Sequence, residues 1–95
     1  MALTLKPAQL RLIVEIADQG QVQLAADAMA ITQPAASRML AEVERMAGAA
    51  LFLRQPKGME PTEAGAVVIR RARAILREMR SMAAEVQAVE GGLGG

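Results

Sequence analysis

Residues 32–38, Thr-Gln-Pro-Ala-Ala-Ser-Arg, have the composition of a helix start with a polar outer face and no acidic side chain. The Thr32 hydroxyl is suited to cap a first-turn N–H, and Pro34 is tolerated in the first turn because its missing N–H would have no helical partner there. A short apolar run over 22–29 precedes this stretch across a turn at Ala30–Ile31. The two segments together predict a helix-turn-helix.

Apolar residues recur with helical spacing on both sides of this corner. Before it, the pattern predicts a helix over 7–19 that Gly20 ends. After it, a helix from residue 33 ends at Gly48. The stripe of this helix that we expect to face the core is Ala36, Leu40, Val43 and Ala47. The predicted inward face of the short helix over 22–29 is Leu24, Ala25, Ala28 and Met29.

A small hairpin is predicted between residues 51 and 61. Residues 51–53 are apolar and are followed by a turn-forming run over 55–58, so Lys57 is expected near the tip of the hairpin. Prolines at 56 and 61 limit ladder pairing, which favours a short edge ribbon. Thr62 can then cap a last helix, and the positive end of that helix also favours Glu63.

The last helix is predicted over 63–90. At about 1.5 Å per residue it spans roughly 40 Å, too long to pack wholly on so small a domain. Apolar residues recur along it in steps of four and three, the spacing of a coiled-coil seam. The first turns can pack on the domain, but the remainder needs a partner, so we predict a homodimer through this helix. The seam consists of Val68, Ala72, Ile75, Met79, Met82, Val86 and Val89.

The chain ends in a glycine-rich run. Residues 91–95, Gly-Gly-Leu-Gly-Gly, are expected to break the long helix and to act as a flexible hinge. A chain that ends in such a hinge suggests a piece of a longer protein. The expected organisation is a domain of helix-turn-helix and hairpin over 1–62, a dimerisation helix over 63–90 and the start of a hinge over 91–95.

The composition argues against several classes of site. The 95 residues include no Cys and no His, which removes disulfides, thiolate metal sites and the commonest general base. No carboxylates form an obvious pair for acid–base chemistry, so we expect neither an enzyme nor a metal or cofactor site in this domain. No run approaches the roughly 18–20 apolar residues of a membrane span, and the N-terminus lacks a secretory apolar region. A cytoplasmic protein without a membrane partner is therefore expected.

The charges are segregated although the formal net charge is only +1. Between residues 54 and 80 there are seven basic and three acidic side chains, and Arg38 carries the sole charge between residues 28 and 41. Segregated basic charge can steer a polyanion even when the total is small. The major groove of B-DNA admits one helix and exposes its base edges to the first residues of that helix. The tip (residues 32–38) suits that position.

The outer side chains of the tip match the chemistry of base edges. Gln33 can pair with N6 and N7 of adenine, and Pro34 and Ala35 can contact the methyl group of thymine. These three residues are therefore the predicted base contacts.

Other side chains are suited to phosphate. Thr32 and Ser37 can hydrogen-bond phosphate oxygens, and Arg38 can reach a guanine or a phosphate. Arg54 and Lys57 belong to the hairpin that follows the helix-turn-helix, and a basic hairpin at that place is similar to a wing that contacts the DNA backbone or minor groove. The alternative is that the hairpin binds nothing and that Lys57 at its tip is simply exposed to solvent.

Other interpretations stay open from the residues alone. An ordinary capped surface helix would explain the tip. A helical protein-interaction module that dimerises through the seam would explain the long helix without DNA, and burial of Gln33, Ser37 and Arg38 would favour it. An enzyme is a more distant alternative, which a bound metal or a deep polar pocket would reopen.

Three separated motifs resemble the N-terminal domain of LysR-type transcriptional regulators. They are Leu24-Ala25-Ala26 with Ile31 to Arg38, then Leu51-Phe52-Leu53-Arg54, then Pro61-Thr62-Glu63-Ala64-Gly65. They occur in the order and spacing of that family, and the resemblance extends from residue 5 to about residue 89. It implies a mainly α, winged helix-turn-helix with three helices and a small two-stranded wing, followed by a long linker and dimerisation helix.

The resemblance also implies partners and contacts. The linker helices of the family pair antiparallel, giving dimers on palindromic promoter DNA and often tetramers, with RNA polymerase as a further partner. A small-molecule inducer is expected to bind a C-terminal domain that is absent from this chain. Positions matching the family's base and phosphate contacts are Gln33, Pro34, Ser37 and Arg38, and Lys57 matches the basic wing position.

The chain departs from the family pattern at several positions. Thr32 stands where Ser is more usual, and Gln21 and Gln23 occupy a region where Ser and Thr commonly contact phosphate; of the two, Gln23 is kept as a predicted DNA contact. Pro61 replaces a Leu, and Ile13 stands where an aromatic residue is common. The first three departures could alter backbone contacts or the shape of the wing. The operator, the target genes, the inducer and the sense of regulation do not follow from the sequence.

Overall fold

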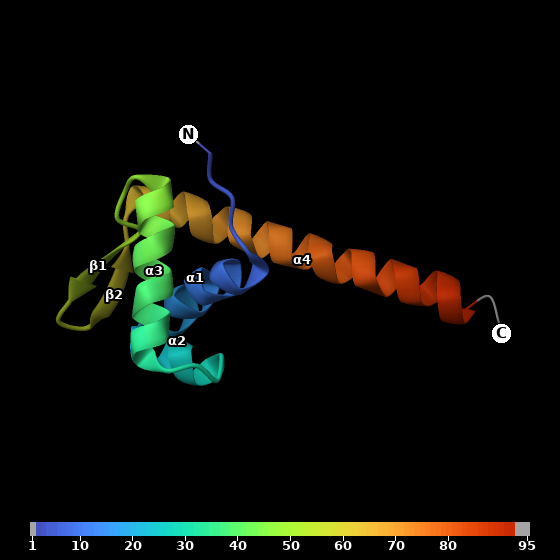
Figure 1. Ribbon diagram of the computed structural model, residues 1–95, viewed down its shortest axis with the longest axis horizontal. Coiled ribbons are helices and arrows are strands. Elements are labelled where there is room, and N and C mark those ends of the chain that lie inside the picture. The colour runs from blue at the N-terminus through green and yellow to red at the C-terminus, as the bar shows by residue number, and fades with distance from the viewer. Residues whose placement is uncertain (1, 93–95) are drawn as a thin grey trace.

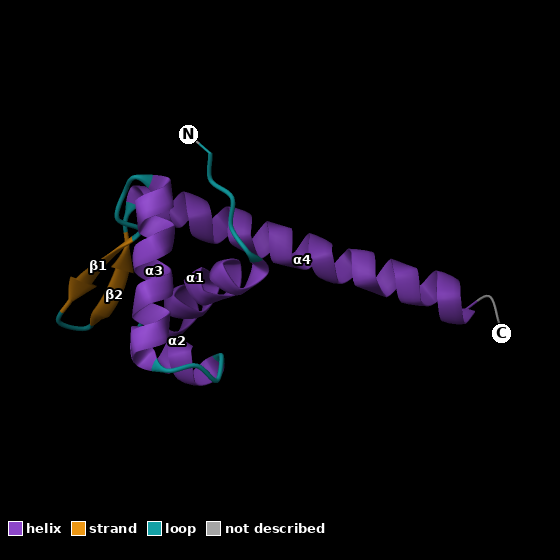
Figure 2. Cartoon of the chain, viewed as in Figure 1, coloured by secondary structure: helices purple, strands orange, loops and turns teal. Residues whose placement is uncertain are grey.

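The computed structural model describes residues 2–92 and is mainly helical, with one two-stranded antiparallel sheet among these residues. Figure 1 shows the short helices and the hairpin gathered into a head, from which the last helix projects as a rod. The elements in chain order are α1 (Pro7–Gln19), α2 (Val22–Ala28), α3 (Gln33–Ala47), β1 (Phe52–Gln55), β2 (Gly58–Pro61) and α4 (Glu63–Gly92). This confirms the predicted winged helix-turn-helix with a long C-terminal helix (Figure 2).

Helix α1 lies at the centre of the core. Its Leu12, Ile13 and Ile16 are fully buried, and the helix contacts α2, α3 and α4. Burying each such side chain stabilises the fold by about 1.5–3 kcal/mol. Gly20 ends the helix in the left-handed conformation, with φ of 79°, as predicted.

The corner between α2 and α3 is built from alanines. Ala25 and Ala26 of α2 and Ala36 of α3 have no exposed surface, so the two backbones approach closely. The turn places Ala30 at φ of 57°, a conformation that costs a non-glycine residue about 1 kcal/mol. The next N–H, that of Ile31, donates to the Ala26 carbonyl oxygen at 3.0 Å and closes the turn.

The predicted inward face of α2 was wrong at two positions. Leu24 is 43% exposed and Ala28 is also exposed, whereas Val22 is buried beside Ala25 and Ala26. The tight corner explains the difference, because only small side chains fit where α2 meets both α1 and α3. The helix turns those residues inward and leaves Leu24 at the surface.

The hairpin and α4 pack on the head through close backbone contacts. Phe52 of β1 pairs with Pro61 of β2, and Gln55 pairs with Gly58 at the turn. The Thr62 hydroxyl accepts the Gly65 N–H at 2.9 Å and donates to the Ala50 carbonyl oxygen at 2.6 Å. Thr62 therefore caps α4, as predicted, and also ties the start of α4 to the end of the α3–β1 connection.

Helix α4 extends farther than the sequence predicted. Gly91 and Gly92 are helical, so the helix does not break after residue 90. Each glycine costs only about 1 kcal/mol relative to Ala, too little to stop a long helix that is already formed. Residues 93–95 of the predicted hinge lie outside the described residues.

Gly65 is the glycine on which the α4 junction depends. A Cβ at this position would overlap the Leu51 carbonyl oxygen, whereas a Cβ at Gly91 would meet open space. We expect Gly65→Ala to lower the free energy of unfolding by about 2–3 kcal/mol, whereas Gly91→Ala should leave it unchanged or raise it by up to about 1 kcal/mol. Urea unfolding followed by circular dichroism checks both variants, and equal stabilities would contradict the close contact.

Candidate nucleic-acid interface

The first turn of α3 is capped as the sequence predicted. The Thr32 side-chain oxygen accepts the Ala35 N–H at 3.2 Å, and the first turn contains no acidic residue. Because the cap uses Thr32 only as an acceptor, its hydroxyl hydrogen stays available to an outside acceptor such as a phosphate oxygen. Pro34 lies exposed in the same turn.

Gln33 and Ser37 are coupled to each other, which sequence reasoning did not predict. Gln33 Nε2 donates to Ser37 Oγ at 2.8 Å across one helical turn, and both residues are half-buried. The bond fixes the amide while leaving its carbonyl oxygen and second N–H hydrogen for a base edge. Ser37 keeps its own hydroxyl hydrogen as a donor. The pair is thus oriented before any ligand arrives.

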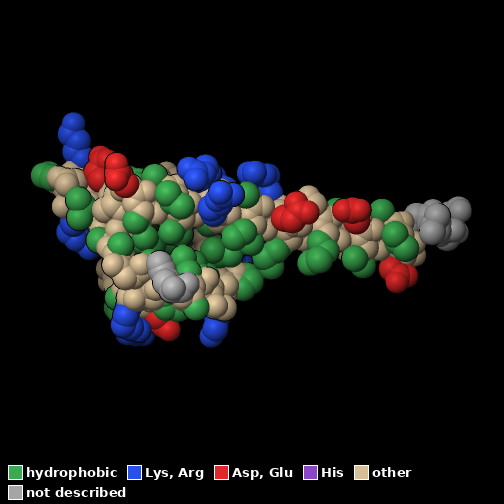
Figure 3. Space-filling model, turned by 90° about the horizontal axis from the view of Figure 1, so that it is seen from above, with side chains coloured by type: hydrophobic (Ala, Val, Ile, Leu, Met, Phe, Trp, Pro, Cys, Tyr) green, Lys and Arg blue, Asp and Glu red, His purple; other side chains and the backbone are tan. Residues whose placement is uncertain are grey.

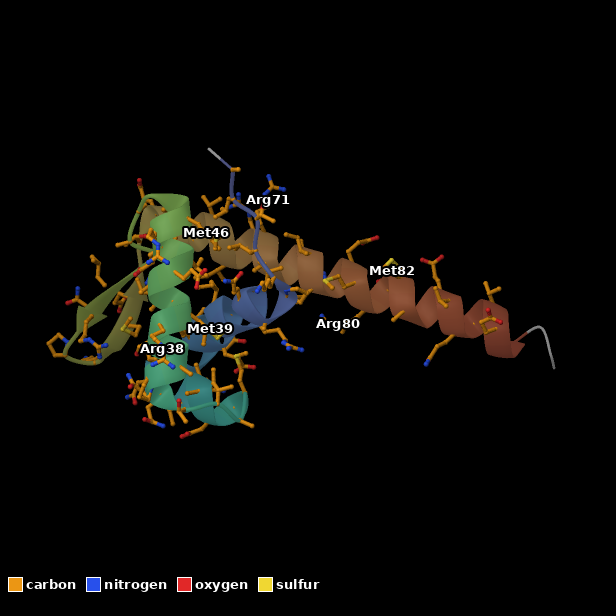
Figure 4. The ribbon with its side chains drawn as sticks, in the orientation of Figure 1. Arg38, Met39, Met46, Arg71, Arg80 and Met82 are labelled. Carbon is orange, nitrogen blue, oxygen red and sulfur yellow. The ribbon has the colours of Figure 1, made fainter. Side chains whose placement is uncertain are left out.

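Arg38 supplies the charge of the tip. Its side chain is exposed, and no carboxylate among residues 2–92 lies within ion-pair distance of it. Figure 4 shows it on the N-terminal half of α3. An exposed guanidinium with five N–H donors suits either a guanine edge or a phosphate.

Glu44, a later acid of the same helix, is engaged inside the domain. Its carboxylate oxygen Oε2 accepts the Leu51 N–H at 2.7 Å and the Phe52 N–H at 3.4 Å. These bonds hold the start of β1 against α3. No local sequence pattern predicts this contact, because the partners lie seven and eight residues apart across a turn.

The hairpin is docked beside the start of α2. The Met59 N–H donates to the Gly20 carbonyl oxygen at 2.7 Å, and Gly58, at φ of 138°, has no room for a Cβ beside that carbonyl. Arg54 and Lys57 are both exposed on this hairpin, with Lys57 in the turn between the strands as predicted. The close contact between Gly58 and Gly20 thus sets the positions of Arg54 and Lys57.

A groove of about 260 Å³ runs between the hairpin and the first turns of α2 and α3. It brings together Gln23, Gln33 and Arg54, three predicted contacts from three separate elements, and adds Gln21 and Gln55. No carboxylate lines it. Its polar lining is therefore made of amides and one guanidinium, all able to donate to an anionic backbone.

Two of the predicted DNA contacts, Gln23 and Ala35, are partly engaged or covered within the domain. Gln23 Nε2 already donates to Asp27 Oδ1 at 2.9 Å, so one of its two donor hydrogens is used on α2. Ala35 is half-buried, which leaves Pro34 as the more accessible apolar side chain of the first turn.

The predicted seam divides between two environments. Ala72 is fully buried and Val68 packs on the core, whereas Ile75 and Met79 are 46% and 38% exposed. The last three seam residues, Met82, Val86 and Val89, are 61%, 56% and 62% exposed. The part of α4 that projects beyond the head, residues 75–92, is called the rod below. Figure 3 shows a band of hydrophobic side chains that continues from the head onto the rod.

Helix α4 is also tied to α1 by an ion pair. Arg73 Nη2 lies 2.7 Å from Asp18 Oδ1, and this hydrogen bond raises the pKa of Arg73. Both side chains are partly exposed, so the pair adds little stability on its own. Its effect is to remove Arg73 from the basic residues that are free to bind an anion.

Residues 2–92 contain neither a cluster of metal-ligating side chains nor a membrane-spanning helix. No cluster of three or more potential metal-ligating His, Cys, Asp or Glu side chains occurs there. Within the same range, every helix is too short or too polar to cross a membrane.

The chain is similar to known proteins both in sequence and in fold. The family model for bacterial regulatory helix-turn-helix proteins of the lysR family matches residues 7–66. The chain is 44% identical over 88 residues to the HTH-type transcriptional regulator GbpR of Rhizobium radiobacter, a match that covers 90% of this chain and 29% of that regulator. The chain thus spans less than a third of the length of this curated relative.

Solved structures share the fold. The CbnR DBD–DNA complex superposes with a TM-score of 0.83 at 27% identity, covering 90% of this chain and 99% of that one. The BenM DBD in complex with benA site 1 DNA gives a TM-score of 0.86 at 24% identity, covering 93% and 99%, which shows the common fold.

The Glu44 contact generates a prediction about stability. Glu44→Ala removes a charged acceptor from two backbone N–H groups, so we expect the free energy of unfolding to fall by about 1.5–3 kcal/mol. Glu42→Ala, on an exposed face of the same helix, is the matched control and should stay within about 0.5 kcal/mol of the parent. Thermal unfolding checks both variants. An equal loss in the two would mean that Glu44 does not hold β1.

Proposed function

Since this chain belongs to the lysR family of bacterial regulatory helix-turn-helix proteins, we propose that it binds a specific promoter site in double-stranded DNA. The first turn of α3 enters the major groove, and the hairpin acts as a wing on the adjacent backbone or minor groove. One observation carries the proposal most directly. The tip holds a pre-oriented Gln33–Ser37 pair beside the exposed Arg38, with no acid in its first turn.

Base recognition falls to the outer side chains of the first turn. Gln33 offers a donor and an acceptor to adenine, held in place by Ser37. Pro34 and Ala35 contact thymine methyl groups. Each well-matched base contact is worth about 1–3 kcal/mol of discrimination.

Phosphate contacts set the register on the duplex. Thr32, Ser37 and Arg38 bind the backbone at the edge of the major groove. Arg54 and Gln23 line the groove between wing and helix, and the phosphate backbone passes along this groove. Lys57 extends the contact from the tip of the wing.

The active unit is a homodimer on a palindromic site. The exposed apolar rod offers the interface, and two-fold symmetry presents two tips to two half-sites. Residues 1–62 form the DNA-binding domain and the helix from residue 63 the dimerisation element. The relatives are longer than this chain, and we extend the proposal to the full-length protein. It acts in the cytoplasm, binds a small-molecule inducer through a further domain, assembles into tetramers and contacts RNA polymerase.

The alternative is a helical interaction module that never binds DNA. It would bury Gln33, Ser37 and Arg38 in a protein contact. Arg38 is exposed, and the other two are half-buried against each other, which favours DNA recognition. The relative GbpR is a transcriptional regulator rather than an enzyme, which also argues against catalysis.

Selection of bound duplexes from a random library tests the proposed function. We expect enrichment of a sequence with two-fold symmetry, bound with an affinity that falls steeply as salt rises, because phosphate contacts release counterions. Absence of any enriched sequence at low salt would overturn the proposal.

Arg38→Ala should weaken binding to the selected duplex by about 1–3 kcal/mol without a comparable loss of stability. Arg80→Ala, which removes the same charge from the exposed rod, is the matched control and should leave affinity nearly unchanged. Fluorescence anisotropy on a labelled duplex measures both. Equal effects of the two substitutions would show that Arg38 acts only through net charge.

Substitutions of Gln33 and of Lys57 should affect DNA binding in different ways. Gln33→Ala should relax the preference for one base in each half-site, whereas Lys57→Ala should weaken all duplexes alike and reduce the salt slope by about one per protomer. Repeating the selection with each variant, followed by a salt titration, separates these outcomes. A uniform loss in Gln33→Ala would remove Gln33 from the base contacts.

A further inference from the structure

Two glutamine side chains of the polar groove are held in the same way. Gln23 Nε2 donates to Asp27 Oδ1 at 2.9 Å, and Gln33 Nε2 donates to Ser37 Oγ at 2.8 Å, each across one helical turn. Both glutamines line the groove of about 260 Å³, and Figure 1 shows α2 and the first turn of α3 at the same end of the head. Ser37 is a proposed DNA contact in its own right, whereas Asp27 does not line the groove.

We propose that Asp27 is a positioning residue for DNA binding, which fixes the Gln23 amide and leaves one of its N–H hydrogens for a phosphate oxygen. This inference rests on the proposed function and adds a residue that acts only through Gln23. An ionised carboxylate has no hydrogen to donate, so only the NH₂ end of the amide can face it. The hydrogen bond therefore decides which end of the amide is turned toward Asp27.

Asp27 occupies an unfavourable position for the stability of α2. It lies in the last turn of a helix that ends at Ala28, and no basic side chain occurs in that turn. The carbonyl groups at a helix C-terminus carry partial negative charge, so a carboxylate is repelled there. Asp27 is also the one acidic residue between residues 19 and 41, the segment proposed to approach DNA. A side chain that breaks two local preferences is expected at a functional position, and the bond to Gln23 identifies the function.

Holding Gln23 before DNA arrives lowers the cost of binding. A glutamine side chain loses rotational freedom when it contacts a phosphate, and a side chain that is already ordered loses less. Gln23 is exposed, so the hydrogen bond to Asp27, rather than packing, restrains it. The charge of Asp27 acts in the opposite direction, because a carboxylate near the DNA repels phosphate. A test must therefore separate the position of Gln23 from the charge of Asp27.

Two substitutions of Asp27 make this separation. Asp27→Asn removes the charge but keeps a side-chain oxygen that can accept the Gln23 N–H, whereas Asp27→Ala removes both. We expect Asp27→Asn to bind the selected duplex at least as tightly as the parent, and Asp27→Ala to bind about threefold more weakly than Asp27→Asn. Fluorescence anisotropy on the labelled duplex measures both. The difference between them should disappear when each is combined with Gln23→Ala.

Two controls test whether the effect is local to the groove. Gln19 Nε2 donates to Glu15 Oε1 at 3.2 Å across one turn of α1, and neither residue lines the groove. Glu15→Gln and Glu15→Ala should therefore bind the duplex equally tightly. Asp27→Ala should not lower the melting temperature, because it removes an unfavourable charge and introduces a better helix former. Its weaker binding then cannot come from unfolding.

The outcomes distinguish this inference from the proposed function. Equal affinities of Asp27→Asn and Asp27→Ala would overturn the role of Asp27, and Gln23 would remain a DNA contact if Gln23→Ala still weakens binding. A difference that persists in the Gln23→Ala background would also overturn positioning, because Asp27 would then act without Gln23. A parent chain that binds no duplex would overturn the proposed function and, with it, this inference.

Discussion

The close approach of α2 to α3 is the constraint on which the rest of the head depends. Ala25, Ala26 and Ala36 have no exposed surface at the crossing, so any larger side chain there would separate the two helices. The same approach forces Ala30 into a left-handed conformation and sends Leu24 to the surface. Because the corner is tight, the first turn of α3 projects from the head with its polar side outward.

The position of the wing depends on backbone contacts rather than on side-chain packing. The Gly20 carbonyl oxygen accepts the Met59 N–H, and Glu44 accepts the N–H groups that start β1. These contacts place the hairpin beside the starts of α2 and α3, which creates the polar groove. The geometry of the candidate interface therefore depends on these contacts within the domain.

Local signals in the sequence predicted the fold well. The caps at Thr32 and Thr62 and the helix end at Gly20 act within one turn of chain, and each was placed correctly. The inward face of α2 and the bonds of Glu44 were not predictable, because they depend on how distant elements meet. The helical state of Gly91 and Gly92 was not predicted, because glycine commonly marks a helix end although it costs a formed helix only about 1 kcal/mol per residue.

Helix α4 packs on the head through its first turns and leaves the rest of its apolar side chains exposed. The central claim is that the tip and the wing, not the rod, contact DNA. Amide chemical shifts of the isotope-labelled chain, recorded as a selected duplex is added, test it directly. We expect the largest changes in chemical shift over residues 32–38 and 54–58, with residues 82–89 little affected. Changes confined to the rod, with the tip unmoved, would contradict it.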